Sequence, residues 1–453
     1  MVAAAAIRQV GAGGLQSTAV TVAPPAPGPV AEAPATAPPR PRSLRRRIGQ
    51  KLLAIGLGFG FALILAECGL RIAGIGRAVF HRPDGTYGMV LIPGATGTFV
   101  NEGRSDVAIN ADGFRDVRHP RSKPAATLRI AVLGDSFTEA LQVPRDQAFW
   151  AVLPEQLGGC KALAGRTVET MSFGVSGYST AQELLLLQRR VWDWSPDVVV
   201  LAFLTGNDVA DNHPDLGAAA APFFRLDGDT LVLDGSRARS LGTGGRAMLW
   251  MIRHSRVLQI ANQVRLNLGQ CGKVGACGED LDVGKGEAGL RNQLYAEPAD
   301  DTWREAWRVT EALLRAMRDD VTAHHARFFL VTLSNAIQAH PDLAARERFR
   351  ALVKVPDLFY PDRRLGEFAA RAGIDALALA PRFAERAAAE HRYLHGFPGP
   401  NLGKGHWNAG GHRLAAELLA PWMCERLAAT PSTTPPVPDA PPALDVTPPA
   451  PPP

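Results

Sequence analysis

The stretch LRIAVLGDSFTE, residues 128–139, decides the fold that the sequence predicts. Its apolar run Ile130–Leu133 is followed at once by Gly134, which is typical of a short buried β-strand that ends in a turn. Ser136 comes directly after that strand. Open α/β sheets bind ligands at the carboxyl ends of their strands, so a serine held there is well placed to act as a nucleophile. Gly, Asp and Ser are also ordinary turn residues, so the rest of the chain has to decide between the two interpretations.

The same order of buried strand, loop and helix recurs along the chain. This alternation predicts an α/β domain with a mostly parallel sheet and helices on both of its faces. Apolar runs of strand length lie at 168–173, 197–204, 327–333 and 374–379, and helical spacing lies at 149–157, 179–194, 302–324, 342–353, 362–370 and 406–427.

Two segments depart from this order. Residues 211–297 are glycine-rich and contain one helical piece, 247–268, with no clear strands, so an insertion is predicted there. Such an insertion serves either as a lid that shapes the substrate site or as a solvent loop, and the sequence leaves both open. Residues 77–123 are rich in Gly, Pro and Asp and are expected to cover one flank of the core, which extends from 124 to 429.

A membrane anchor is predicted at residues 43–76. A basic cluster precedes Leu52–Ala66, a run of apolar side chains and glycine that continues past Glu67 and Arg71. The full run of about 24 residues is long enough to span a bilayer with some tilt. No small-residue cleavage site follows it, so we expect an uncleaved signal anchor. Basic residues stay on the cytoplasmic side, which places the chain from about residue 77 in the periplasm or outside the cell.

The ends of the chain and its charge add further expectations. Residues 1–42 and 430–453 are rich in Ala and Pro and are interpreted as disordered tails. The net charge of +5 lies largely in the basic cluster before the anchor, which topology and anionic lipid explain. No zinc-finger spacing or basic stripe indicates nucleic-acid binding. His324-His325 lacks a third ligand, so neither a metal nor a cofactor is expected.

The five cysteines are too few for a disulfide scaffold. Cys271 and Cys277 lie in a glycine-containing loop, and they either close a small disulfide in an oxidising compartment or remain free thiols. Cys68 lies in the anchor. Cys160 and Cys424 are too far apart in sequence for the sequence to pair them.

An acyl-transfer site needs a nucleophile, a base and donors for the developing oxyanion. Ser136 is the candidate nucleophile, and His406, just before the last helix, is the candidate base. The candidate oxyanion donors are the backbone N–H groups of Ser136 and Gly177 and the side-chain amide of Asn207. Asp135 is expected to stabilise its own turn, and Asp208 to organise the loop of Asn207.

At these residues the sequence resembles the SGNH, or GDSL-type, hydrolase superfamily. The resemblance covers roughly residues 124–429, and the anchor is similar to that of membrane-bound bacterial members. It implies a three-layer α/β/α flavodoxin-like fold in which Ser136 attacks an ester carbonyl while His406 takes up and returns the proton. The blocks that carry it are Gly134–Ser136 for the nucleophile, Phe173–Gly177 for the oxyanion glycine, Gly206–Asp208 for G-x-N-D and His406–His412 for the histidine.

One departure from the family concerns the acid that orients the histidine. The family usually places an Asp two or three residues before that histidine, where this chain has Lys404 and Gly403. No carboxylate occurs between Glu390 and His406. A carboxylate from elsewhere, a backbone carbonyl, or a Ser-His dyad could substitute, and the sequence leaves all three open.

These observations predict a membrane-anchored serine ester hydrolase. Its expected partners are the membrane and an acyl ester or acylated saccharide, whereas the sequence predicts no oligomeric state. An O-acyltransferase or deacetylase that acts on cell-envelope polysaccharide would use the same nucleophile. A non-catalytic carbohydrate-binding derivative of the fold is the third hypothesis, motivated by the absent Asp.

Overall fold

The computed structural model describes residues 44–217, 220–274 and 292–429. The two tails predicted from the sequence lie outside these residues. The chain divides into two compact units, Met1–Ala62 and Leu63–Pro453. Helix α1 (Leu44–Ile72) begins in the first unit and ends in the second. The sheet and all the residues of the candidate site belong to the second unit.

A five-stranded parallel sheet forms the centre of the second unit, in the order β11-β10-β7-β5-β6. In chain order the strands therefore run 2-1-3-4-5, the flavodoxin-like arrangement. The α/β fold class predicted from the sequence is confirmed. The strands are β5 (Thr127–Gly134), β6 (Thr167–Gly174), β7 (Val198–Leu204), β10 (Arg327–Leu333) and β11 (Asp375–Ala378).

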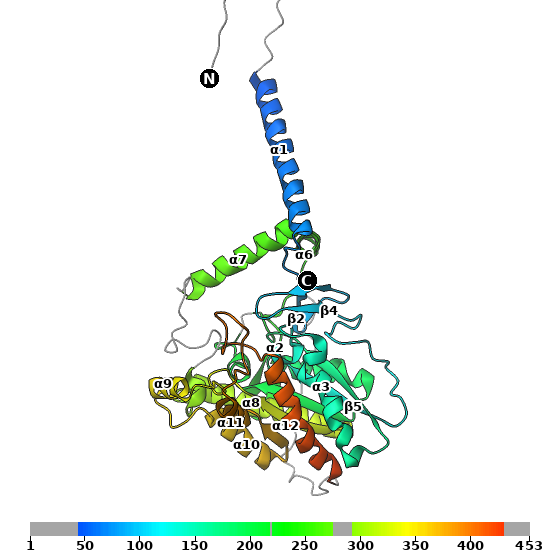
Figure 1. Ribbon diagram of the computed structural model, residues 1–453, viewed down its shortest axis with the longest axis vertical. Helices are drawn as coiled ribbons and strands as arrows, with labels where there is room; N and C mark the ends of the chain where they lie inside the picture. The colour runs from blue at the N-terminus through cyan, green and yellow to red at the C-terminus, as the bar shows by residue number, and fades with distance from the viewer. Residues whose placement is uncertain (1–43, 218–219, 275–291, 430–453) are drawn as a thin grey trace, which may run out of the picture. The chain divides into compact units, whose positions relative to one another are not determined.

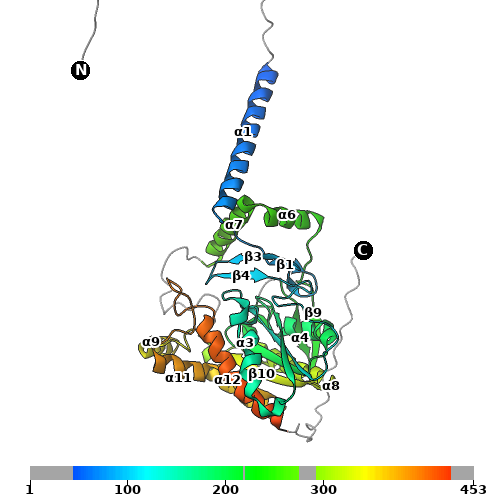
Figure 2. The same cartoon turned by 45° about the vertical axis from the view of Figure 1, so that its right-hand side comes forward.

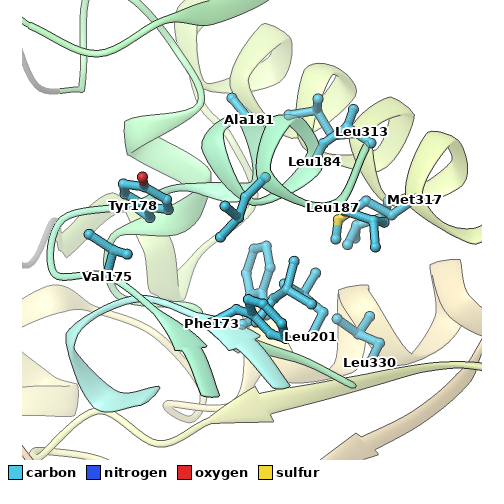
Figure 3. Packing of buried hydrophobic residues seen from close by; sticks show 14 of the residues in the cluster. Phe173, Val175, Tyr178, Ala181, Leu184, Leu187, Leu201, Leu313, Met317 and Leu330 are labelled. Carbon is cyan, nitrogen blue, oxygen red and sulfur yellow. The ribbon is translucent and has the colours of Figure 1, made fainter. Parts of the chain in front are cut away.

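Helices cover both faces of this sheet because its strands are apolar on both sides. Along β7, Leu201 and Phe203 belong to one core, whereas Val200 and Ala202 belong to the other. Figure 3 shows the first core, where Phe173 and Leu201 of the sheet face the leucines of α4 and α8. Helices α4 (Thr180–Arg189), α8 (Asp301–Ala323) and α10 (Tyr360–Ala372) pack on that face, and α3 (Phe149–Gln156), α11 (Ala380–Glu390) and α12 (Ala409–Ala428) on the opposite face.

The covering segment, residues 77–123, folds into two small antiparallel sheets. They pair β1 (His81–Asp84) with β2 (Gly88–Leu91) and β3 (Thr96–Phe99) with β4 (Ser105–Ala108). The segment is bound to the loop that follows Ser136, because the buried guanidinium of Arg115 donates hydrogen bonds to the carbonyls of residues 139, 140 and 143. It therefore packs against the edge of the sheet at which the candidate site lies.

The predicted insertion contains two strands, so the prediction that it has no clear strands is wrong. Strands β8 (Phe223–Asp227) and β9 (Thr230–Asp234) form a hairpin around Gly228, whose φ of +60° suits a tight turn. The single predicted helix is also two helices, α6 (Thr243–His254) and α7 (Arg256–Val274). The break has a local cause, since Ser255 is extended and its hydroxyl accepts a hydrogen bond from the Leu258 N–H.

One disulfide joins Cys160 to Cys424, with 5.6 Å between their Cα atoms. The sequence does not predict this pair, because 264 positions separate the two cysteines. Helices α3 and α12 lie side by side on one face of the sheet, and this brings the two residues together (Figure 1). Cys68 is exposed and free, and the side chains of Cys271 and Cys277 lie outside the described part of the chain.

The remaining helices are short or peripheral, except α1. Among the described residues, one helical stretch, Ile48–Ile72, is long and apolar enough to cross a membrane, with a mean hydropathy of 2.0 over its most apolar part. The others are α2 (Ser136–Glu139), α5 (Asp208–Asp211) and α9 (Leu343–Val353).

Candidate active site

Ser136 is the first residue of α2, directly after the central strand β5. The preceding residue, Asp135, caps this helix because its carboxylate accepts a hydrogen bond from the Phe137 N–H at 2.9 Å. A side chain at Gly174, at the end of β6, would lie 2.3 Å from the backbone nitrogen of Glu139. Glycine there lets α2 pack closely on the strand ends and holds the serine at the carboxyl edge of the sheet.

His406 lies in the loop before α12 and reaches Ser136 across 270 positions of sequence. The distance from His406 Nε2 to Ser136 Oγ is 2.7 Å. The loop is held at its other end by Asn408, whose side-chain oxygen accepts hydrogen bonds from the first N–H groups of α12. The structure thus brings the predicted nucleophile and base within hydrogen-bond distance.

The carboxylate that faces His406 is that of Glu102, in the turn between β3 and β4, and the sequence does not predict this contact. Its carboxylate lies 2.7 Å from His406 Nδ1 and 3.3 Å from the backbone nitrogen of His406. Gly405 permits this approach, since its φ is +70° and a Cβ there would lie 3.0 Å from both carboxylate oxygens. Of the three alternatives left open by the sequence, the structure contains the carboxylate from elsewhere in the chain.

Hydrogen bonding around the imidazole assigns its tautomer. Burial would raise the pKa of the Glu102 carboxyl, but the hydrogen bonds and charge of His406 outweigh it and hold that pKa below its usual value. An ionised Glu102 accepts the proton of Nδ1, which leaves the lone pair of Nε2 facing the hydroxyl of Ser136. This is the arrangement that a general base requires.

A second serine and histidine, both buried, support the loop that contains His406. The buried His395 lies 2.7 Å, by its Nδ1, from the Gly405 carbonyl and 2.9 Å, by its Nε2, from Ser334 Oγ. Trp407 Nε1 donates a further hydrogen bond to the same hydroxyl. Burial lowers the pKa of His395 to about 3, so its imidazole is neutral near pH 7. Ser334 is fully buried, and this pair therefore positions the loop instead of reacting.

Two of the three predicted oxyanion donors, Gly177 and Asn207, lie in the loops that follow β6 and β7, the strands on either side of β5. Gly177 has a φ of +77°, which favours glycine, and a Cβ at this position would meet nothing within 4 Å. Its loop is tied to α2 because Ser176 N donates to the buried carboxylate of Glu139, which also binds His81. Asn207 Nδ2 donates to Asp135 at 3.2 Å, which places this amide beside the nucleophile's turn.

Besides Glu139, three further carboxyl groups near these loops are buried: Asp135, Asp208 and Glu183. Asp208 accepts a hydrogen bond from the Leu204 N–H at 2.9 Å and so holds the turn before Asn207. Glu183, on α4, makes no side-chain hydrogen bond with the residues that the structure describes, and no pattern in the sequence indicates that it lies near the site. Burial, together with the other carboxyls, raises the pKa of Glu183 and Asp208 well above their usual values. Within the described ranges no group of three or more His, Cys, Asp or Glu could hold a metal ion.

Replacing Glu183 with glutamine is expected to make stability less dependent on pH. A carboxyl whose pKa is raised by folding binds a proton that the unfolded chain, with a pKa of about 4.3, has released. The folded state of the native chain therefore loses stability as the pH rises from that value through the folded pKa. Each unit by which the pKa is raised contributes about 1.4 kcal/mol to this loss.

Thermal unfolding of the native and Glu183→Gln chains at pH 5 and pH 8 measures the effect. The variant is expected to lose less thermal stability between the two pH values than the native chain. Glu425→Gln, on the exposed end of α12, is the matched control and should follow the native chain. Equal losses in all three proteins would mean that Glu183 does not titrate differently in the folded state.

Esterases are among the solved structures to which this chain is similar. An acetyl xylan esterase is 14% identical, with a TM-score of 0.30, over 64% of this chain and 97% of its own. A lipolytic protein of the G-D-S-L family from Desulfitobacterium hafniense DCB-2 is 12% identical, with a TM-score of 0.32, over 65% of this chain and 99% of its own. A two-domain esterase active on acetylated mannans is 12% identical, with a TM-score of 0.34, over 70% of this chain and 53% of its own.

No protein-family model and no curated protein sequence matches the chain. The G-D-S-L family, which the motif blocks of the sequence resemble, is represented among the structural neighbours.

Proposed function

We propose that the chain is a serine ester hydrolase of the SGNH type with Ser136, His406 and Glu102 as its catalytic triad. The observation that carries this proposal is the continuous hydrogen-bonded path from Ser136 Oγ through both nitrogens of His406 to the Glu102 carboxylate, with both distances at 2.7 Å. Such a path is the recurring geometry of activated serine nucleophiles, whatever the order of the residues in the chain.

Ester cleavage follows from this geometry in two steps. Ser136 Oγ attacks the ester carbonyl while His406 Nε2 takes its proton, and the imidazolium then protonates the leaving alcohol as the ester C–O bond breaks. Water next attacks the acyl-serine while His406 Nε2 takes its proton, and His406 returns that proton to Ser136 Oγ as the bond between the acyl carbon and Oγ breaks and the acid is released. Glu102 holds the imidazole in position and stabilises its charged form throughout.

The backbone N–H groups of Ser136 and Gly177 and the amide of Asn207 are proposed to hold the oxyanion. Asn207 uses one N–H of its amide to hold Asp135, and the second N–H is left for the substrate. Donors of this kind contribute about 10²- to 10³-fold each to kcat. Asp135 and Asp208 act only through the turns that they stabilise.

We further propose that the catalytic unit lies outside the cytoplasmic membrane, held by α1 as a single-pass anchor. The apolar stretch Ile48–Ile72 and the basic residues that precede it support this orientation. The Cys160–Cys424 disulfide supports it independently, because disulfides form and persist in oxidising compartments such as the periplasm. The hypothesis of a non-catalytic binding protein loses its motivation, since Glu102 occupies the place of the absent Asp.

The full chain in detergent, assayed on short-chain p-nitrophenyl esters, tests the proposal. We expect turnover that is lost in step with covalent labelling by a fluorophosphonate, and the label on the peptide that contains Ser136. A folded protein that neither turns over the esters nor takes the label would overturn the proposal. Acyl transfer to an oligosaccharide acceptor in preference to water would instead assign the acyltransferase hypothesis.

A further inference from the structure

The end of α1 is bound to the junction between α6 and α7. The Glu67 carboxylate accepts hydrogen bonds from the first two backbone N–H groups of α7, at 3.0 and 3.1 Å, and from Ser255 Oγ at 2.9 Å. Arg71, one turn later on α1, donates to Glu67 and to the carbonyl of His254. All these residues belong to the unit Leu63–Pro453. The helix break at Ser255 is therefore fastened to the last turns of the proposed anchor.

This junction lies where the apolar part of α1 ends. Glu67 is the first charged residue after Lys51, whose long side chain can reach back to the inner interface. At 1.5 Å per residue, the stretch from Ile48 to Ala66 is about 28 Å long, close to the thickness of the hydrocarbon core of a bilayer. Glu67, and with it the α6–α7 junction, is thus expected at the outer interface of the membrane.

Helix α6 presents an exposed apolar face at this level. Met248, Trp250 and Met251 are 51%, 61% and 41% exposed. Leu249, on the opposite side of the helix, packs against the core and fixes the orientation of α6. Figure 2 shows α6 and α7 on the same side of the unit as the small strands β1, β3 and β4. Arg246 and Arg253 lie three residues before and four residues after Leu249, so they share its side of the helix. A helix with one apolar and one basic side, next to a membrane span, has the pattern of an interfacial helix.

A cavity of about 230 Å³ beside the junction is lined by Arg71, Arg253 and Arg256, with His254. The Glu67 carboxylate pairs with Arg71 and accepts a hydrogen bond from the Arg256 N–H. One carboxylate against three arginine side chains leaves an excess of positive charge at the cavity. Arg253 makes no side-chain hydrogen bond or ion pair with any residue that the structure describes. A cationic cavity at an interface, next to an apolar helix face, fits the phosphate of a phospholipid headgroup.

We propose that α6 and α7 form an interfacial membrane contact, in which the apolar face of α6 enters the outer leaflet and the arginine-lined cavity binds the phosphate of an anionic phospholipid. This inference rests on the proposed anchoring of α1 in the membrane. It gives the catalytic unit a second contact with the membrane besides the anchor, and so a defined orientation on the bilayer surface.

Tryptophan fluorescence of the full chain in vesicles with brominated acyl chains tests the apolar contact. The chain has eight tryptophans, and all of them except Trp250 are buried or half-buried. Bromine in the acyl chains is expected to lower the fluorescence that depends on Trp250 at least about twofold, and Trp250→Phe should remove that part of the quenching. Equal quenching in the native and Trp250→Phe proteins would overturn the inference.

Flotation of the same vesicles separates this inference from the anchoring on which it rests. Protein that floats with the vesicles but shows no quenching at Trp250 would leave the anchor in place and overturn the proposed contact of α6 and α7 with the membrane. Protein that does not float would overturn the anchoring by α1 and, with it, the proposed membrane contact of α6 and α7.

Lipid that stays bound through detergent purification, measured by native mass spectrometry, tests the cavity. From vesicles of phosphatidylcholine and phosphatidylglycerol, the native chain should retain phosphatidylglycerol, and Arg253→Gln should retain about fivefold less. Arg239→Gln, an exposed arginine away from the cavity, is the control and should match the native chain. Unchanged retention in Arg253→Gln would overturn the site, and displacement of the lipid by millimolar inorganic phosphate would assign the cavity to a soluble phosphate instead.

Discussion

Replacing Ser136 with alanine is expected to abolish ester turnover, with a fall in kcat of about 10⁶-fold. The hydroxyl is the proposed nucleophile and lies 2.7 Å from His406 Nε2, and the methyl group of alanine cannot attack an ester. The fold should survive, because α2 is capped by Asp135 and not by Ser136. Steady-state kinetics on a short-chain ester, beside thermal unfolding of the same samples, measures both properties.

Ser122→Ala is the matched control for this variant. Ser122 is exposed in the covering segment, and its loss should leave kcat and the unfolding midpoint unchanged. Turnover that persists in a folded Ser136→Ala protein at the native rate would show that another group is the nucleophile. Ser334 also lies near a histidine, but it is fully buried and could not serve.

Replacing Glu102 with glutamine is expected to lower kcat by about 10³- to 10⁴-fold while KM changes little. The amide has the shape of the carboxylate but not its charge, so it cannot stabilise the imidazolium, and its NH₂ group favours the wrong tautomer of His406. Substrate binding does not need Glu102, which is why the loss should fall on kcat. Kinetics of Glu102→Gln and Glu102→Asp over a range of substrate concentrations separates the two constants.

Glu102→Asp keeps the charge on a shorter side chain, so it should recover part of the activity that Glu102→Gln loses. Glu297→Gln, at an exposed position far along the chain, controls for the loss of a carboxylate as such. A Glu102→Gln protein with the native kcat would show that Ser136 and His406 work as a dyad. It would also remove the triad from the proposed function while leaving the nucleophile in place.

The origin of Glu102 changes how the covering segment is interpreted. The sequence predicts only that residues 77–123 cover a flank of the core. In the structure this segment supplies Glu102 to His406 and His81 to Glu139, and it also packs against the loop after the nucleophile through Arg115. A shortened chain that begins after Glu102 would therefore keep the central sheet and Ser136 but lose the acid.

Some parts of this protein are determined by short stretches of sequence. Four apolar residues followed by Gly-Asp-Ser predict β5 and the position of Ser136, because burial on both faces and a turn leave a local pattern. His406 is indicated by the histidine block of the family that the sequence resembles, directly before the apolar spacing of α12. The alternation of such elements also suffices for the α/β class of the fold. Each of these features depends on neighbours a few residues away.

Other parts are decided only by the tertiary structure. Glu102 approaches His406 across 304 positions, and Cys160 meets Cys424 across 264. Glu67 receives the N–H groups of α7 in the same way, from a helix far along the chain. No periodic or local pattern in the sequence predicts these contacts, because a carboxylate in a turn or a cysteine near a helix end has the same sequence context whichever residue it contacts. Only the packing of the β3–β4 hairpin and of α3 against α12 determines which distant groups meet, and with them whether the histidine has an acid.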